Sequence, residues 1–296
     1  MANKEKKQTV SGIAAMKNRS KISVVTAYDY CTALICDRAG LDILLVGDSA
    51  GMVVLGYPNT VRVEMADMLL FCGAVSRGAK RAMVVGDMPF GSYQSGPTQA
   101  VENAVRMIKS GCDAVKLEGG AEIQKTVESI VSAGIPVMGH IGLKPQTATL
   151  WEGYKVQGRT AEAAQKLLAD AFALEQAGAF SIVLEMVSTE AAGEISKALR
   201  IPTIGIGSGP KCDGQVLVLH DLIGMYEDIK PRFAVRNADV SSVIFDAVSR
   251  YSMDIKGEKF PAESHTFHMD SGELDKWAGT FRKEESGTVN KGKRLD

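Results

Sequence analysis

Short apolar runs alternate with amphipathic segments along most of the chain. Most of these runs are apolar at every position instead of alternating with polar residues, which is typical of parallel strands buried on both faces. The pattern predicts eight strands, at 22–29, 42–48, 81–89, 113–120, 135–142, 180–187, 201–209 and 214–224.

The segments between these runs have the spacing of amphipathic helices. They lie at 31–40, 60–79, 98–111, 122–134, 160–178 and 189–200. Three of them end in a glycine just before the next strand, at Gly111, Gly134 and Gly178, which makes a weak helix–glycine–strand repeat. Strands that alternate with helices in this way build a parallel sheet.

Eight parallel strands can form a closed barrel or an open, doubly wound sheet. The strand count matches a (β/α)8 TIM barrel, and no G-x-G-x-x-G fingerprint of a dinucleotide fold follows the first strand. We therefore predict the barrel. The sequence GIGSGP at 205–210 follows the seventh strand, where barrels often bind phosphate, although a plain tight turn explains it equally well.

The two ends of the chain differ from this pattern. After about residue 260 the sequence becomes rich in charged residues, glycine and serine. We expect one barrel domain at 1–268, with a loose N-terminal extension over 1–10, and a polar C-terminal tail at 269–296. Such a tail is either disordered or draped over a neighbouring subunit.

Composition narrows the class of protein. The chain is 45% hydrophobic with a net charge of −1, which is ordinary for a globular protein and argues against nucleic acid or an anionic membrane as partner. No apolar run approaches the roughly 20 residues of a membrane helix, and the polar N-terminus is unlike a signal peptide. The five scattered cysteines form no C-x-x-C pair and indicate reduced thiols, so we expect a cytoplasmic protein.

Acidic residues stand at or near the ends of several predicted strands. In a barrel the carboxyl ends of the strands converge on one mouth, where active sites are built. Carboxylates that converge repel one another unless a cation or a proton lies among them. The acidic residues are Asp29, Asp48, Asp87, Glu118 and Glu185.

Three of these carboxylates, Asp48, Asp87 and Glu118, predict a site for a hard divalent cation, with Mg²⁺ as the best fit. The lack of a cysteine or histidine cluster argues against zinc. Lys116 and Glu118 lie two residues apart, so their side chains point to the same face. The lysine could pair with an anionic substrate, and a structural Lys–Glu ion pair explains the spacing equally well.

Glu185 is flanked by apolar residues in VLEMV, which would raise its pKa and suit it to proton abstraction. A carboxylate that is merely buried against the lysine is the alternative. His140 could bind the substrate or orient a carboxylate, although a lone histidine at a strand end more often only completes hydrogen bonds. His220 has no supporting neighbour, and His265 and His268 look structural.

A series of motifs between about residue 10 and residue 268 resembles ketopantoate hydroxymethyltransferases. They are TAYDY, LLVGDSAGMVVLGY, GDMPFGSY, AVKLEGG, VMGHIGLKPQ, YKVQGR, LEMV, IPTIGIGSG, DGQVLVLHD and FPAESHTFH. The resemblance implies a (β/α)8 barrel related to enzymes of the phosphoenolpyruvate/pyruvate type. It also implies Mg²⁺, 5,10-methylenetetrahydrofolate as co-substrate and a homodecamer.

The resemblance also implies roles for residues. Asp48, Asp87 and Glu118 match the metal ligands, Ser49 and Lys116 match the contacts to the 2-oxo acid, and Glu185 matches the general base. Besides Ser49 and Lys116, we expect Asp48, Asp87 and His140 to bind the substrate. The implied reaction transfers a hydroxymethyl group to 3-methyl-2-oxobutanoate through a Mg²⁺-stabilised enolate. It gives 2-dehydropantoate, on the route to pantothenate and coenzyme A.

Two other functions remain open from the residues alone. A Mg²⁺-dependent C–C lyase of the isocitrate lyase or phosphonomutase type would share the barrel, but its KKCGH-like cysteine motif is missing. A non-catalytic barrel would have lost a metal or base position, and all of them are present.

Overall fold

A computed structural model describes residues 6–147 and 155–279. Part of the expected tail, 280–296, and the first residues of the N-terminal extension lie outside this range. The chain divides into two compact units, and the boundary in the sequence falls between Val240 and Ser241. The tail boundary expected at residue 268 stays a prediction.

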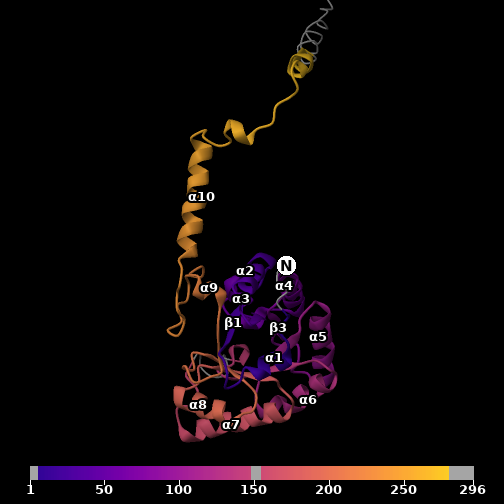
Figure 1. Ribbon diagram of the computed structural model, residues 1–296, viewed down its shortest axis with the longest axis vertical. Coiled ribbons are helices and arrows are strands. Elements are labelled where there is room, and N and C mark those ends of the chain that lie inside the picture. Colours follow the sequence, from indigo (N-terminus) through magenta and orange to yellow (C-terminus); the bar gives the residue numbers. More distant parts are fainter. Residues whose placement is uncertain (1–5, 148–154, 280–296) are drawn as a thin grey trace, which may run out of the picture. The chain divides into compact units, whose positions relative to one another are not determined.

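The first unit is a closed barrel of eight parallel strands in chain order, as predicted (Figure 1). The last strand pairs with the first, with Val216 opposite Val24, which closes the sheet. The strands are β1 (Ile22–Thr26), β2 (Ile43–Val46), β3 (Met83–Asp87), β4 (Ala114–Glu118), β5 (Val137–Gly142), β6 (Ser181–Glu185), β7 (Thr203–Ile206) and β8 (Gly214–Leu217).

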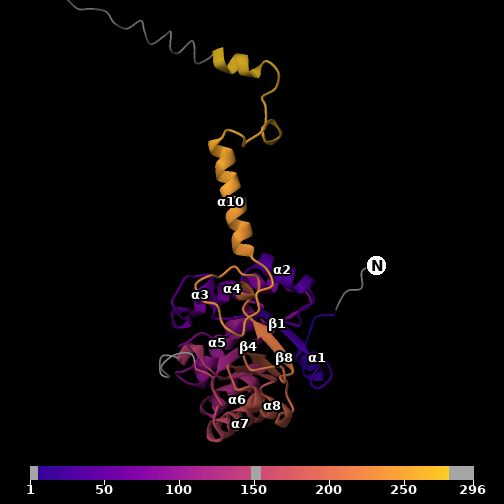
Figure 2. The same cartoon turned by 90° about the vertical axis from the view of Figure 1, so that its left-hand side faces the viewer.

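All six expected helices are present. Helices α5 to α8 lie on the outer side of the barrel (Figure 2). The expected helices are α2 (Tyr30–Arg38), α4 (Met65–Gly78), α5 (Pro97–Lys109), α6 (Gln124–Ser132), α7 (Ala161–Gln176) and α8 (Thr189–Ala198). Shorter helical pieces are α3 (Ala50–Val53), η1 (Thr60–Arg62) and η2 (Ala121–Ile123).

Three predictions differ from the structure by more than small shifts at element ends. The helix expected at 60–79 begins at Met65, after the separate turn η1. The strand expected at 214–224 ends at Leu217, and α9 (Leu219–Leu222) follows it, because a short apolar run does not distinguish strand from helix. The extension expected to be loose over 1–10 is tied to the barrel by a backbone bond from Gln8 to Arg81. It leads into α1 (Val10–Ala15), whose Ile13 is fully buried.

Successive side chains of each strand point alternately to the inside and the outside of the barrel, and they form two separate apolar cores. Side chains at every second position, such as Ile43 and Leu45 of β2, fill the barrel interior, and α1 adds Ile13 to this inner core. The intervening residues, such as Leu44 and Val46, pack outward against the helices. Both faces of most strands are thus buried, which explains why these strands read as continuous apolar runs. The outward faces of β1 and β8 are the exceptions, since Ser23 and Gln215 are exposed.

The second unit contains most of α10 (Val240–Lys256), the short η4 (Glu263–His265) and helical residues at 273–279. No expected element covers α10, which has no buried residue; Val243, Phe245 and Val248 are among its exposed apolar side chains. Within the described ranges, no helix combines the length and apolar character needed to cross a membrane.

Candidate active site

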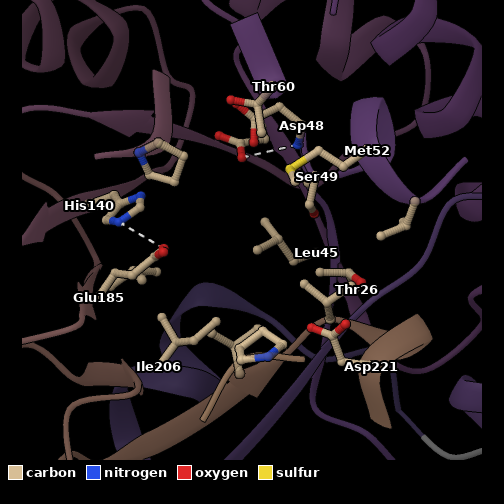
Figure 3. A pocket seen from close by; sticks show the side chains of 18 of the residues that line it. Thr26, Leu45, Asp48, Ser49, Met52, Thr60, His140, Glu185, Ile206 and Asp221 are labelled. Atoms are coloured by element: carbon tan, nitrogen blue, oxygen red, sulfur yellow. Dashed lines mark hydrogen bonds and ion pairs between the residues drawn. The ribbon is translucent and has the colours of Figure 1, made fainter. Parts of the chain in front are cut away.

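The carboxyl ends of the strands surround a cavity of about 380 Å³ (Figure 3). This volume lies within the range of small-molecule sites. All of the predicted site residues line it: Asp48, Ser49, Asp87, Lys116, Glu118, His140 and Glu185. The convergence expected from the strand ends is therefore present for these residues. Asp29 is the exception: it does not line the cavity, and its side chain accepts the N–H of Thr32 at the start of α2.

The pleat of the strands carries most of these side chains into the cavity. In β3, Met83 and Val85 face the barrel interior, and Asp87 follows two residues later on the same face. The same spacing leads from Val183 to Glu185 in β6. The inward-facing side chains of each of these strands are thus apolar inside the barrel, and the last one, at the mouth of the barrel, is polar.

Lys116 lies at the centre of the acidic residues. Its ammonium group is 2.6 and 2.7 Å from the two oxygens of Asp87 and 3.8 Å from Oε1 of Glu118. All three residues are at most 5% exposed. Burial opposes the charge of the ammonium group, but the carboxylates of Asp87, Glu118 and Asp48 prevail and raise the pKa of Lys116.

The lysine does not neutralise the whole cluster. Burial, together with the charges of Asp87 and Glu118, raises the pKa of Asp48 well above its ordinary value. Burial also raises the pKa of Asp87, although Lys116 opposes this effect. Three carboxylates therefore share one ammonium group in a buried space, and an additional cation would relieve their repulsion.

The donor atoms fit a divalent cation that also binds water and substrate. Oε1 of Glu118 is buried and has no hydrogen-bond partner in the described parts of the chain. Over these same parts, no group of three or more histidine, cysteine, aspartate or glutamate side chains is arranged to hold a metal ion. Asp87 is turned toward Lys116, so a cation here would take one or two carboxylates and complete its shell with other oxygens, as Mg²⁺ typically does.

His140 stands between two carboxylates. Its Nδ1 is 3.4 Å from Oε1 of Glu118, and its Nε2 is 3.4 Å from Oε2 of Glu185. The Glu185 side chain is 16% exposed, toward the cavity. Burial raises its pKa to about 7, against the opposing charge of His140. Glu185 is thus suited to exchange protons near neutral pH.

Comparison with known proteins identifies the family. A sequence model described as ketopantoate hydroxymethyltransferase matches residues 7–263. The chain belongs to this family. It is 56% identical to a 3-methyl-2-oxobutanoate hydroxymethyltransferase of Cenarchaeum symbiosum, over 88% of this chain and 98% of the relative. It is 54% identical to one of Nitrosopumilus maritimus, over 91% and 97%.

As a ketopantoate hydroxymethyltransferase family member, the chain is a transferase. Solved structures with the same barrel include phosphonopyruvate hydrolase (TM-score 0.58, 11% identity, covering 96% of this chain and 99% of that one). A phosphoenolpyruvate phosphomutase from Streptomyces platensis has a TM-score of 0.58 at 15% identity, covering 96% and 100%. At such low identity these structures show the fold alone.

Ser49 lies at the start of α3 without capping it through its side chain. Its hydroxyl is instead 2.8 Å from the hydroxyl of Tyr28. Ser49 also lines the cavity, so its free hydrogen-bonding capacity is available to a substrate.

Sequence reasoning missed two residues that hold the carboxylates of Asp48 and Glu118 in place, Gln146 and Tyr93. The amide nitrogen of Gln146 donates to Oδ2 of Asp48 at 3.0 Å, and its backbone N–H donates to Oε2 of Glu118 at 3.1 Å. The hydroxyl of Tyr93 donates to the amide oxygen of Gln146 at 2.7 Å. Both residues stand in the quoted motifs, but an uncharged amide and a phenol give no pattern that singles them out.

The glycine-rich stretch after β7 forms a tight turn. The Ser208 hydroxyl is buried and donates to the carbonyl of Leu184 at 2.7 Å, and it accepts the N–H of Val187 at 3.0 Å. This supports the plain-turn interpretation of GIGSGP. His220 is also structural, since its ring packs on Tyr28 with the ring centres 5.5 Å apart.

Proposed function

We propose that the protein transfers a hydroxymethyl group from 5,10-methylenetetrahydrofolate to 3-methyl-2-oxobutanoate and forms 2-dehydropantoate. The observation that carries this proposal is the pairing, in one cavity, of a buried carboxylate cluster with a glutamate whose pKa is about 7. The names of relatives at 56% and 54% identity support the same reaction. The product leads to pantothenate and coenzyme A.

The metal is part of the proposal. The carboxylates that would provide the ligands of Mg²⁺ are those of Asp48, Asp87 and Glu118, with one or two of them bound to the ion directly. When bound, the ion would polarise the 2-oxo group and make the neighbouring C–H more acidic. Gln146 keeps the carboxylates of Asp48 and Glu118 apart at fixed positions through its two hydrogen bonds. These bonds orient the carboxylates before any cation arrives.

The remaining residues act on the organic substrate. Glu185 takes the proton from C3, which leaves that carbon nucleophilic toward the methylene group of the folate. A new C–C bond forms to this methylene group, its C–N bonds to the folate break, and water supplies the hydroxyl group, so that tetrahydrofolate is released. His140 lies against Glu185 and keeps its carboxylate directed into the cavity. Lys116 and Ser49 orient the substrate carboxylate, since an ammonium group and a hydroxyl both donate to carboxylate oxygens.

The cellular compartment and the oligomeric state of the enzyme are also proposals. We place it in the cytoplasm and expect a homodecamer, both on the family resemblance. The five free cysteines support a reducing compartment.

The direct test is product formation. Purified protein with 3-methyl-2-oxobutanoate, 5,10-methylenetetrahydrofolate and Mg²⁺ is expected to release 2-dehydropantoate, detected by mass spectrometry. Omission of the folate or of Mg²⁺ should abolish the product. Well-folded protein that forms no product in the complete mixture would contradict the proposed function.

The pH dependence of the first step should follow Glu185. A base works only when it is deprotonated, so kcat/KM for deuterium exchange at C3 should rise with pH and reach half its plateau near pH 7. NMR of the 2-oxo acid in D₂O measures this rate. A midpoint near 4.5, the ordinary pKa of a glutamate, would show that burial does not set the base strength.

A further inference from the structure

The wall of the cavity opposite Glu185 carries a second carboxylate that the proposed mechanism leaves unused. Asp221 and Thr26 lie on one side of the cavity, and His140 and Glu185 lie on the other (Figure 3). In residues 6–147 and 155–279, the Asp221 carboxylate has no hydrogen-bond or ionic partner. It therefore faces the cavity with both oxygens free to accept hydrogen bonds.

The fold holds Asp221 in place through its neighbours in the chain. The N–H of Leu219 donates to the buried hydroxyl of Thr26 at 3.0 Å, which fixes the start of α9 to the end of β1. The ring of His220 packs on Tyr28, whose hydroxyl bonds to Ser49. Asp221 follows these two anchored residues directly, so its carboxylate occupies a set position at the barrel mouth.

A surface that is largely apolar and in part flat extends from Asp221 toward Glu185. Val218, Ile206 and Phe233 line the cavity here, and Ile206 is the neighbour of Glu185 in register. Tyr226 and Arg232 are polar residues that line the same cavity. Phe233 packs directly against Gly207, where a Cβ would lie 2.9 Å from the aromatic ring. Burial raises the pKa of Asp221, as expected for a carboxylate beside apolar groups. A ligand that suits this wall presents a flat ring with N–H donors along one edge.

We propose that Asp221 binds the pyrimidine edge of the reduced pterin ring of the one-carbon donor, and that the ring lies against Ile206 and Phe233. That edge carries a 2-amino group and the N3–H, two parallel donors that match two carboxylate oxygens. It is also the edge farthest from the methylene carbon. A pterin anchored at Asp221 therefore directs its methylene group across the cavity, toward the side that holds Glu185.

This assignment rests on the proposed function, which makes a methylenetetrahydrofolate the donor. It divides the cavity between the two substrates: the carboxylate cluster and Glu185 bind the 2-oxo acid, and the wall with Asp221 binds the pterin. The division gives a role to Asp221, the cavity carboxylate that lies apart from the cluster around Lys116.

Binding of the pterin alone tests the assignment. Affinity for 6-methyltetrahydropterin and for tetrahydrofolate is measured by calorimetry on the full chain and on Asp221→Asn. We expect the substitution to weaken both by about 10- to 100-fold, because one donor then meets an NH₂ group and a charge-assisted bond is lost. Asp221→Glu, which keeps the carboxylate, should recover part of the affinity. Affinity for 3-methyl-2-oxobutanoate with Mg²⁺ should stay the same in both variants.

Asp228→Asn is the matched control, because Asp228 is exposed in the segment that follows and does not line the cavity. Its pterin affinity should equal that of the wild type. Wild-type pterin affinity in Asp221→Asn, or an equal loss in Asp228→Asn, would overturn the assignment. Failure of the proposed function would appear elsewhere, as wild-type protein without C3 exchange or product.

Discussion

Replacing Glu185 with glutamine is expected to slow deuterium exchange at C3 of 3-methyl-2-oxobutanoate by about 10²- to 10⁴-fold, the usual contribution of a positioned general base. The amide has nearly the same shape as the carboxylate but cannot accept the proton. Glu185 is the cavity carboxylate whose pKa lies near 7, and among the described residues its side chain forms one ion-pair contact, with Nε2 of His140 at 3.4 Å. The expected loss is thus a loss of chemistry and not of structure.

Two measurements separate the base from a structural carboxylate. Calorimetric affinities for Mg²⁺ and for the 2-oxo acid should survive in Glu185→Gln. Glu102→Gln, a matched change on the exposed face of α5, should leave exchange at the wild-type rate. Unchanged exchange in Glu185→Gln would remove Glu185 from the role of base.

Replacing Asp48 with asparagine is expected to weaken Mg²⁺ binding by more than the roughly 10- to 100-fold that the loss of an outer-shell partner costs. Without metal, the same change should leave the free energy of unfolding unchanged or raise it. Burial and two neighbouring carboxylates disfavour the charge of Asp48, and the substitution removes that charge. An asparagine oxygen can still accept the bond from Gln146.

Asp87→Asn provides the contrast. It should also weaken Mg²⁺ binding, but it leaves the buried Lys116 without its close partner and should cost about 3–5 kcal/mol of stability. Mg²⁺ titration and urea unfolding of the metal-free variants measure both effects. Undiminished Mg²⁺ affinity in Asp48→Asn would count against the carboxylate site, and a large loss of its stability would make Asp48 a structural residue.

The pattern of the chain was sufficient for the barrel and for most of the site. Strands buried on both faces leave an apolar run, and a polar residue that continues the inward-facing row must lie at the mouth, as Asp87 and Glu185 do. α10 was missed; it has no buried residue, so its apolar side chains do not mark a buried face. The chemical roles of all the site residues, as metal ligands, substrate contacts or base, stay predictions: Asp48, Ser49, Asp87, Lys116, Glu118, His140 and Glu185.

Pairings between distant residues could not be predicted. The spacing of Lys116 and Glu118 suggested an ion pair within one strand, yet the closer partner of Lys116 is Asp87, its neighbour in register on β3. Gln146 reaches Asp48, which lies 98 residues earlier in the chain. Such contacts depend on which strands become neighbours and on their register, and a single sequence does not show either of these.

The closure of the sheet also decides how copies of this chain can meet. An open sheet has edge strands whose unpaired N–H and C=O groups invite another chain to add a strand, which leads to swapping and to fibrous aggregates. Here β1 and β8 use those groups on each other. Any assembly that involves the barrel must therefore form through helix faces and loops, where side chains and not backbone groups select the partner.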